Sequence, residues 1–112
     1  MDKKSLWYEW ETVALSSYVK LWYNLVKKNF TIRWGELDLI LEDDNNLVFV
    51  EVKTVSYIED LHDYITKNKL KLLEKTIKSY LYKYPTNKDI RLDVVFIKDN
   101  QVYQIYQWIW ID

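Results

Sequence analysis

The sequence contains no cysteine and a single histidine, and these two absences exclude several kinds of functional site. Without cysteine the chain has no disulfide framework, no thiol nucleophile and no cysteine-ligated zinc site. With one histidine it cannot build a histidine-rich metal centre. That residue, His62, lies in a polar segment, where we expect an ordinary solvated side chain.

Long apolar runs are also missing. No run approaches the ~20 residues of a membrane-spanning helix, and the polar start of the chain is not followed by the apolar segment of a signal peptide. We therefore expect a cytoplasmic protein without membrane association. The chain has 112 residues, of which 49% are hydrophobic, and this predicts a single domain over residues 1–112 with a core of its own.

Charge is nearly balanced, with a formal net value of −1 at pH 7. This argues against a protein that coats nucleic acid indiscriminately. It does not exclude a nuclease, because active-site carboxylates subtract from the total. The largest local excess of positive charge consists of five lysines: Lys67, Lys69, Lys71, Lys75 and Lys78. A solvated helix face explains them as well as a surface that contacts the phosphate backbone of DNA.

The chain has only one glycine, Gly35, and one proline, Pro85. A lone glycine at the start of a strand indicates a bulge or a close approach by another part of the backbone or side chains. The two residues before it, Arg33 and Trp34, suit contacts with a phosphate and with a base or sugar. They suit equally a surface arginine and a core indole, and for Trp34 we favour the core.

Hydrophobic periodicity predicts an α/β protein with the order αβββαββ. The expected helices span residues 6–26, with Lys27 and Lys28 at the carboxyl end, and 67–84, ended by Pro85. The expected strands span residues 30–34, 37–41, 47–52, 90–97 and 102–111. Asp93 lies mid-strand and would pair with Arg91 or a lysine, or join a polar cluster. The last strand carries large apolar residues on both faces, so both are covered or one forms a dimer interface.

The strands at 37–41 and 47–52 flank a run of turn formers, residues 43–46, and therefore predict a hairpin. If Glu42 pairs with Leu47, antiparallel register places Asp38 opposite Glu51, with Cβ atoms about 4.5–5.5 Å apart. Two carboxylates at that distance repel unless a cation lies between them. Side chains alternate along a strand, so Lys53 shares a face with Glu51.

An aspartate followed one strand later by Glu-x-Lys has a clear chemical use. Two carboxylates can hold a hard divalent cation, which polarises a phosphodiester and lowers the pKa of bound water. A lysine such as Lys53 can position or deprotonate that water, or neutralise charge on the phosphate. The alternative is a surface hairpin with ordinary charges. The apolar run 48–50, which looks buried on both faces, favours a site.

Glu11 falls within the apolar stripe of the first expected helix, beside Ala14 and Tyr18. A buried carboxylate costs several kcal/mol unless it is paired or bound to a cation. Glu11 therefore either reaches water or a lysine at the edge of the stripe, or points at the same site as Asp38 and Glu51.

Taken together, the element order and the acidic residues resemble the PD-(D/E)XK nuclease superfamily. Closer still is the resemblance to the YraN-like family, small bacterial proteins for which an endonuclease activity has been suggested and whose fold is related to archaeal Holliday-junction resolvases. The matching stretches are Asn29-Phe30, Arg33, residues 35–40, residues 47–54, Lys69, Leu73, Tyr80-Leu81 and residues 91–95. They cover most of the chain from Glu11 onwards.

The resemblance implies a restriction-endonuclease-like three-layer fold, with a mixed central sheet flanked by helices. It implies Mg²⁺- or Mn²⁺-dependent hydrolysis of DNA, including branched or structured DNA. Asp38, Glu51 and Glu11 would hold the metal, and Lys53 would position or activate water. The residues expected to contact DNA are Arg33, Lys67, Lys69, Lys71 and Lys75.

The chain departs from the family pattern outside the expected metal residues. Trp10 replaces a glycine, the segment between Thr54 and Lys69 is short and lacks a Phe-Gly pair, and lysines replace a longer run of arginines. These changes fall where DNA would be gripped. A second interpretation is therefore a nuclease-fold domain that binds DNA or a protein partner and cuts weakly or not at all. Cutting both strands of a duplex would need a homodimer, and the sequence does not reveal whether the chain forms one.

Overall fold

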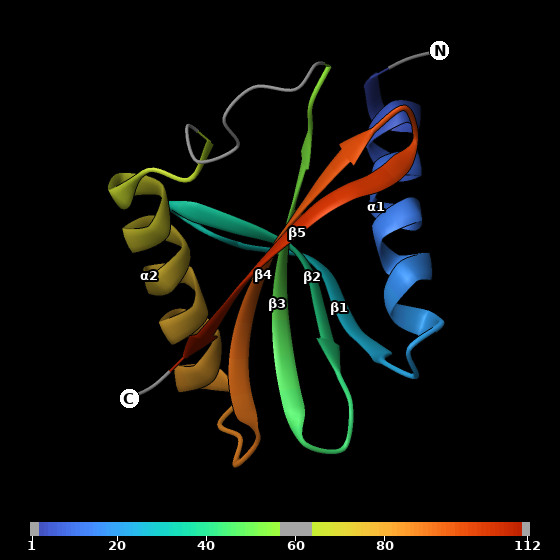
Figure 1. The fold of residues 1–112 in the computed structure, drawn as a ribbon. Coiled ribbons are helices and arrows are strands. Elements are labelled where there is room, and N and C mark those ends of the chain that lie inside the picture. The colour runs from blue at the N-terminus through green and yellow to red at the C-terminus, as the bar shows by residue number, and fades with distance from the viewer. Residues whose placement is uncertain (1–2, 57–63, 111–112) are drawn as a thin grey trace.

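A five-stranded mixed sheet lies between two helices in the computed structural model, which describes residues 3–56 and 64–110, and side chains for 9–56 and 64–108 (Figure 1). The elements are α1 (Lys3–Val19), β1 (Asn24–Ile32), β2 (Gly35–Glu42), β3 (Asn46–Thr54), α2 (Lys67–Lys83), β4 (Asp89–Lys98) and β5 (Gln101–Trp110). The strands follow one another across the sheet in chain order. The predicted class and the order αβββαββ are confirmed.

The sheet is mixed because one connection crosses over. β3 and β4 are parallel and are joined through α2, whereas the other neighbouring pairs are antiparallel. A parallel pair needs such a long crossover connection, and a helix commonly supplies it. The antiparallel β4 and β5 are instead joined by a two-residue turn, Asp99 and Asn100, with φ of 52° and 59°. Both residues tolerate this left-handed conformation.

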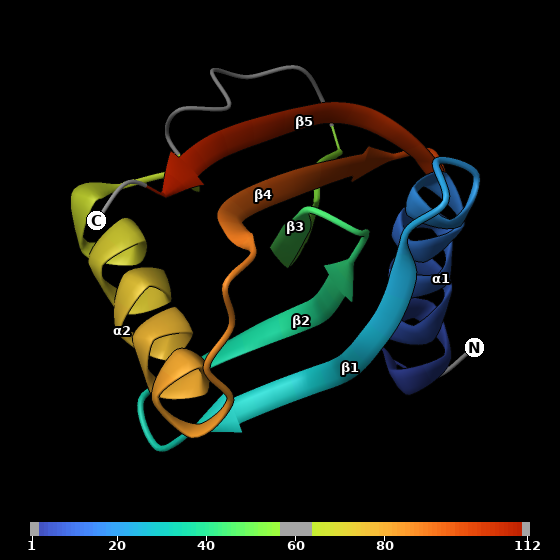
Figure 2. The same ribbon diagram turned by 90° about the horizontal axis from the view of Figure 1, so that it is seen from below.

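The two helices cover opposite faces of the sheet (Figure 2), and the strands direct apolar side chains toward both of them, which builds two apolar layers. The buried members of the layer against α2 are Phe30, Leu37, Ile40, Leu47, Phe49, Leu73, Ile77, Tyr80 and Leu92. Those of the layer against α1 are Ala14, Tyr18, Leu39, Leu41, Val48, Val50, Val95 and Ile97. Because β3 contributes to both layers, it is covered on both faces, as its apolar run predicts. The result is a three-layer nuclease-like arrangement.

A polar network crosses the layer under α1. The fully buried Asp93 accepts hydrogen bonds from the Tyr18 hydroxyl at 2.6 Å and from Nε and Nη2 of Arg91 at 2.8 and 3.0 Å. Burial lowers the pKa of Arg91, but the hydrogen bonds and charge of Asp93 raise it by more. Asp93 thus pairs with Arg91, one of the expected alternatives, and ties α1 to β4.

The first helix ends earlier than predicted. It stops at Val19 rather than at residue 26, and the backbone N–H groups of Leu21 and Tyr23 donate to the Tyr18 carbonyl at 2.9 and 3.2 Å. Trp22 adopts a left-handed φ of 68° and is 88% exposed. The predicted helix was too long because Leu21, Trp22 and Leu25, which follow the helix, continue its apolar spacing. Lys27 and Lys28, expected at the helix end, lie in β1.

The prediction for Trp34 is also wrong, because its indole is 57% exposed rather than in the core. The β1 strand is longer than expected and ends at Ile32, which leaves Arg33 and Trp34 as the turn into β2. The prediction for Gly35 is confirmed: a Cβ there would overlap Oγ1 of Thr76. Glycine therefore allows α2 to lie directly on the start of β2.

The C-terminal half follows the predicted pattern closely. The α2 helix begins after Thr66, whose hydroxyl accepts from the Lys69 backbone N–H at 3.1 Å, and it ends before Pro85. Trp108 packs half-buried against the layer under α2. His62 and Ile111 lie outside the described residues, as do the side chains of 109 and 110. No helix among the described residues is long and apolar enough to span a membrane.

Candidate functional site

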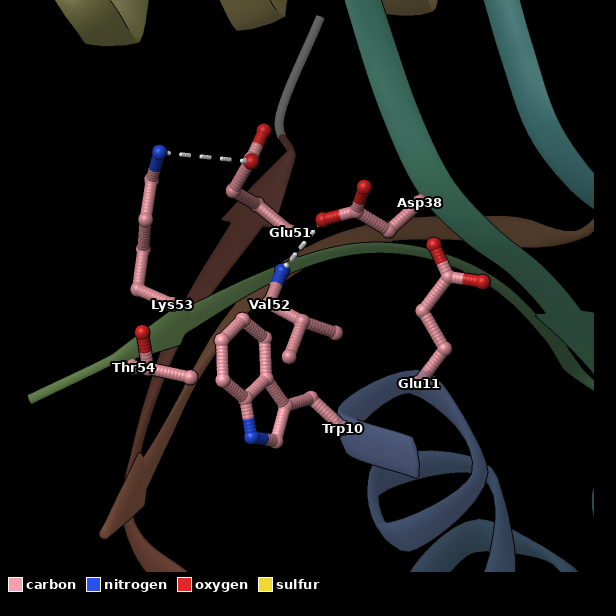
Figure 3. A pocket seen from close by; sticks show the side chains of 7 residues that line it. All are labelled: Trp10, Glu11, Asp38, Glu51, Val52, Lys53 and Thr54. Atoms are coloured by element: carbon pink, nitrogen blue, oxygen red, sulfur yellow. Dashed lines mark hydrogen bonds and ion pairs between the residues drawn. The ribbon is translucent and has the colours of Figure 1, made fainter. Parts of the chain in front are cut away.

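Strands β2 and β3 separate in the middle of the sheet and leave a fork. Their pairing begins at Glu42–Leu47, as the register predicted, and ends at Leu39–Val50. Beyond this point β2 continues alongside β1 and β3 alongside β4. Asp38 is the first residue of β2 on the open side of the fork, and its carboxylate accepts a hydrogen bond from the Val52 backbone N–H at 2.7 Å (Figure 3).

Glu51 lies across the fork from Asp38, and both carboxyl groups are buried, with exposed fractions of 7% and 2%. Burial and the charge of Asp38 raise the pKa of Glu51 to about 7. Burial also raises the pKa of Asp38, although the hydrogen bond from Val52 opposes the shift. Two close, buried carboxyl groups disfavour simultaneous ionisation, so the site favours a state in which one of them keeps its proton.

Two lysines approach Glu51 from different elements. Nζ of Lys53 lies 3.8 Å from Oε1, and Nζ of Lys69 lies 3.7 Å from Oε2. Lys53 shares the strand face of Glu51, as predicted, whereas Lys69 comes from the first turn of α2. Both lysine side chains are about one-third exposed, so these are long, partly solvated ion pairs that only partly offset the burial of the carboxylate.

Glu11 enters the same place from α1. Its side chain is 5% exposed, and Oε1 has no hydrogen-bond partner among the described residues. Burial raises the pKa of Glu11, and the charge of Asp38 raises it further, while Lys28 lowers it. Figure 3 shows the Glu11 carboxylate directed toward Asp38. Of the two positions expected for Glu11, the structure has the one inside the site.

These side chains line a pocket of about 160 Å³, open to solvent on one side (Figure 3). Its lining consists of Trp10, Glu11, Asp38, Glu51, Val52, Lys53 and Thr54. The pocket therefore lies between the middle of α1 and both arms of the fork. Its carboxylates face an opening wide enough for water or a small ion, with apolar surface from Trp10 beside them.

The remaining basic residues expected to contact DNA surround this pocket less closely. Lys67, Lys71 and Lys75 are exposed on α2, and Arg33 is exposed at the β1–β2 turn. Lys78 forms a 3.1 Å ion pair with Glu74 one helical turn away, so its charge is partly compensated. Lys67, Lys71 and Lys75 thus form an exposed basic stripe on α2, on the side of the helix away from the sheet and from Lys69.

Comparison with known families identifies the chain. The family described as "Uncharacterised protein family UPF0102" matches residues 10–97. The chain belongs to this family. This confirms the resemblance to YraN-like proteins, and the matched range contains every residue of the pocket together with Lys69.

Individual UPF0102 proteins align over most of their length. One from Campylobacter fetus is 34% identical over 92 residues, covering 82% of each chain. One from Sulfurihydrogenibium is 34% identical over 109 residues, covering 94% of each chain. A third, from Dichelobacter nodosus, is 37% identical over 89 residues, covering 77% of this chain and 71% of its own.

Sequence reasoning missed two contributors that this UPF0102 chain places at the site. Lys69 was expected to contact DNA only, yet it reaches Glu51. Glu36 was not singled out, yet its charge raises the pKa of both Glu11 and Asp38. The available signal was its spacing, since Glu36 precedes Asp38 by two residues and strand side chains alternate. No pattern in the sequence indicated that α2 would bring Lys69 to β3.

Proposed function

We propose that this chain is a divalent-metal-dependent phosphodiesterase that cuts DNA within a strand. The observation that carries the proposal is the buried Asp38–Glu51 pair at the fork, with Lys53 beside it. A hairpin that served only as a scaffold would have no reason to bury two mutually repelling carboxylates. Burial raises the pKa of both carboxyl groups, and the charge of Asp38 raises that of Glu51 further; a cation bound by the pair would favour their ionised forms.

The donor set fits a hard cation. Carboxylate oxygens are the ligands that Mg²⁺ and Mn²⁺ prefer, and Mg²⁺ commonly keeps several waters beside one or two protein carboxylates. Among the described residues no group of three or more His, Cys, Asp or Glu side chains has the spacing of a ready metal site. We therefore assign Asp38 and Glu51 as direct ligands and let Glu11 act through water.

Each protein group has a separate task in this proposal. A bound Mg²⁺ or Mn²⁺ supplies Lewis acidity toward a phosphodiester oxygen and lowers the pKa of water. Lys53 holds or deprotonates the attacking water, or stabilises charge that builds on the phosphate. Lys69 offers a second cation on the α2 side, where it can contact the phosphate backbone. Glu11 adds negative charge that favours cation binding.

The test combines metal binding with strand cleavage. Calorimetric titration with Mn²⁺ should detect binding in the parent and none in Asp38→Asn or Glu51→Gln. Lys53→Ala should keep Mn²⁺ binding and lose nicking of supercoiled or branched DNA by on the order of 10²-fold or more. Lys20→Ala is the matched control, because Lys20 lies nine residues, or about 14 Å along α1 and its exit, from Glu11. Unchanged Mn²⁺ affinity in both carboxylate variants, or parental nicking by Lys53→Ala, contradicts the assignment.

One observation favours a second function, a nuclease fold that binds DNA or a protein partner and cuts weakly or not at all. Lys53 and Lys69 both contact Glu51, so protein cations already offset part of its charge. The same titration separates the two functions. A parent protein that binds DNA but takes up no Mn²⁺ and nicks no substrate supports the second function and rejects the first.

A further inference from the structure

The turn between β1 and β2 displays an aromatic side chain outside the core. Ile32 pairs with Gly35, so Arg33 and Trp34 form the whole loop. The indole of Trp34 is 57% exposed even though the Arg33 guanidinium lies over its ring, 4.6 Å from the centroid. With the guanidinium on one face of the ring, more than half of the surface of Trp34 is still accessible to a planar ligand.

This turn is held firmly in place by α2. Gly35 lies against Thr76, where any side chain would collide, and its next neighbour is the Leu72 side chain. The Thr76 hydroxyl is itself fixed, because it donates to the Leu72 carbonyl at 2.8 Å. Trp34 therefore lies in a short turn whose following residue, Gly35, packs directly on α2. Because the turn is already ordered, binding a ligand there should cost little conformational entropy.

The same helix connects the turn to the pocket. Lys69, which reaches Glu51, lies one helical turn before Leu72 on α2. Along β2, Trp34 precedes Asp38 by four residues, or roughly 13 Å of strand. At about 3.4 Å per stacked nucleotide, this spans roughly four nucleotides of one DNA strand. A strand with its phosphate at the carboxylates can thus bring a base to the indole.

We infer that Trp34, backed by Arg33, is a stacking site for an unpaired nucleobase of the strand bound at the pocket. Aromatic side chains stack on bases of any sequence, and arginine adds attraction to phosphate and to the ring. In a continuous duplex both faces of every base are covered by neighbours, so the indole has no partner there. The preferred substrate is therefore DNA with single-stranded nucleotides beside the bound phosphodiester, as in an overhang, a flap or a branch. This inference rests on the proposed function for the role of the pocket.

The test measures binding without cleavage. Fluorescence anisotropy in EDTA compares a labelled overhang duplex with a blunt duplex of equal phosphate count, for the parent and for Trp34→Ala, Trp34→Phe and Trp22→Ala. The parent should prefer the overhang. Trp34→Ala should weaken overhang binding by roughly 5- to 100-fold, the range expected for removing one stacked base, with little effect on the blunt duplex. Trp34→Phe should stay within a few-fold of the parent. Trp22→Ala, which removes an equally large exposed indole elsewhere, should change nothing.

Abasic sites placed one at a time along the overhang locate the stacked base. One position should weaken the parent and leave Trp34→Ala unaffected, because the two changes remove the same interaction. The inference is wrong if Trp34→Ala binds the overhang as tightly as the parent does, or if it loses affinity equally for both DNAs. It is also wrong if the parent binds no DNA at low salt. The exposed indole would then be better explained by contact with a protein partner. Trp34-dependent binding without Mg²⁺- or Mn²⁺-dependent cleavage rejects the proposed function alone.

Discussion

At the scale of single residues, the site is defined by charges that are buried together rather than by any residue type alone. Asp38, Glu51 and Glu11 come from two strands and a helix, and each is at most 7% exposed. Each has a raised pKa because burial and neighbouring carboxylates disfavour its ionised form. The folded protein therefore carries an unfavourable charge arrangement at neutral pH, and this has measurable effects on stability.

The energetic cost of ionising the buried Glu51 should appear as a difference between Glu51→Gln and the parent in how the free energy of unfolding depends on pH. With its pKa raised from 4.5 to about 7, the folded protein keeps a proton that the unfolded chain releases between these values. The free energy of unfolding therefore falls as pH rises through this window. The substituted glutamine cannot ionise, so at pH 8 the variant should be more stable to unfolding than the parent, by about 3 kcal/mol for a shift of this size, and the difference should vanish near pH 4.

Differential scanning calorimetry from pH 4 to pH 8 checks this expectation. Glu74→Gln, at a partly exposed i,i+4 ion pair on α2, is the control and should show no comparable gain at pH 8. Adding Mg²⁺ should raise the melting temperature of the parent more than that of Glu51→Gln, which narrows the gap. A Glu51→Gln protein that melts below the parent at pH 8 would mean that its ion pairs with Lys53 and Lys69 outweigh the cost of burial.

Glu11→Gln separates a site residue from a structural one. The Glu11 carboxylate is buried and Oε1 lacks a hydrogen-bond partner among the described residues, so an uncharged amide of the same shape should raise the melting temperature without metal. It should also reduce the added stability that Mg²⁺ provides and slow cleavage. Glu9→Gln, exposed on the same helix, serves as the control. A lower melting temperature with an unaltered Mg²⁺ response would place Glu11 in a structural ion pair.

At the scale of helices and strands, the sequence predicts those features that are set by the spacing of residues close together in the chain. The hairpin register followed from turn formers at 43–46, and counting from Glu42–Leu47 placed Asp38 beside Glu51. Counting could not reveal that the two strands stop pairing at Leu39–Val50, because the fork depends on β1 and β4 drawing them apart. The approach of Lys69 and the clamp of Gly35 on Thr76 likewise depend on where α2 docks.

The end of α1 shows how spacing can also mislead. Leu21 and Trp22 continue the apolar period, yet the helix closes before them through hydrogen bonds to the Tyr18 carbonyl. This closure needs a left-handed residue, a position that normally favours glycine, and Trp22 occupies it with φ 68°. A glycine would have marked the helix end in the sequence. Its absence made the helix look seven residues longer than it is.

Trp22→Gly should therefore stabilise the fold. A non-glycine residue in the left-handed region costs about 1 kcal/mol, and the 88% exposed indole gains little packing in return. We expect a rise of a few degrees in melting temperature. Leu21→Gly is the control, since Leu21 does not have a positive φ, and it should lower the melting temperature or leave it unchanged. A lower melting temperature for Trp22→Gly would show that the indole packs against the protein and stabilises it.

At the scale of the whole molecule, a net charge of −1 conceals an uneven distribution. Three buried carboxylates lie at the fork, while Lys67, Lys71 and Lys75 lie exposed on α2, which also brings Lys69 within 3.7 Å of Glu51. A polyanion would be attracted by the exposed lysines of α2 and repelled by the carboxylates at the fork. The total charge would make its binding weak and sensitive to salt, because few phosphate contacts form and each one releases counterions.

Charge reversal on α2 tests this arrangement. Lys71→Glu with Lys75→Glu should weaken DNA binding and flatten the dependence of log K on log salt, by about one unit of slope for each phosphate that the variant no longer contacts. Lys20→Glu with Lys98→Glu changes the net charge by the same amount at positions away from α2, and it should weaken binding while keeping the parental slope. Anisotropy titrations from about 25 to about 200 mM salt distinguish the two effects. Equal slopes for the α2 variant and the parent would place the DNA elsewhere, with the turn at Arg33 and Trp34 as the next surface to reverse.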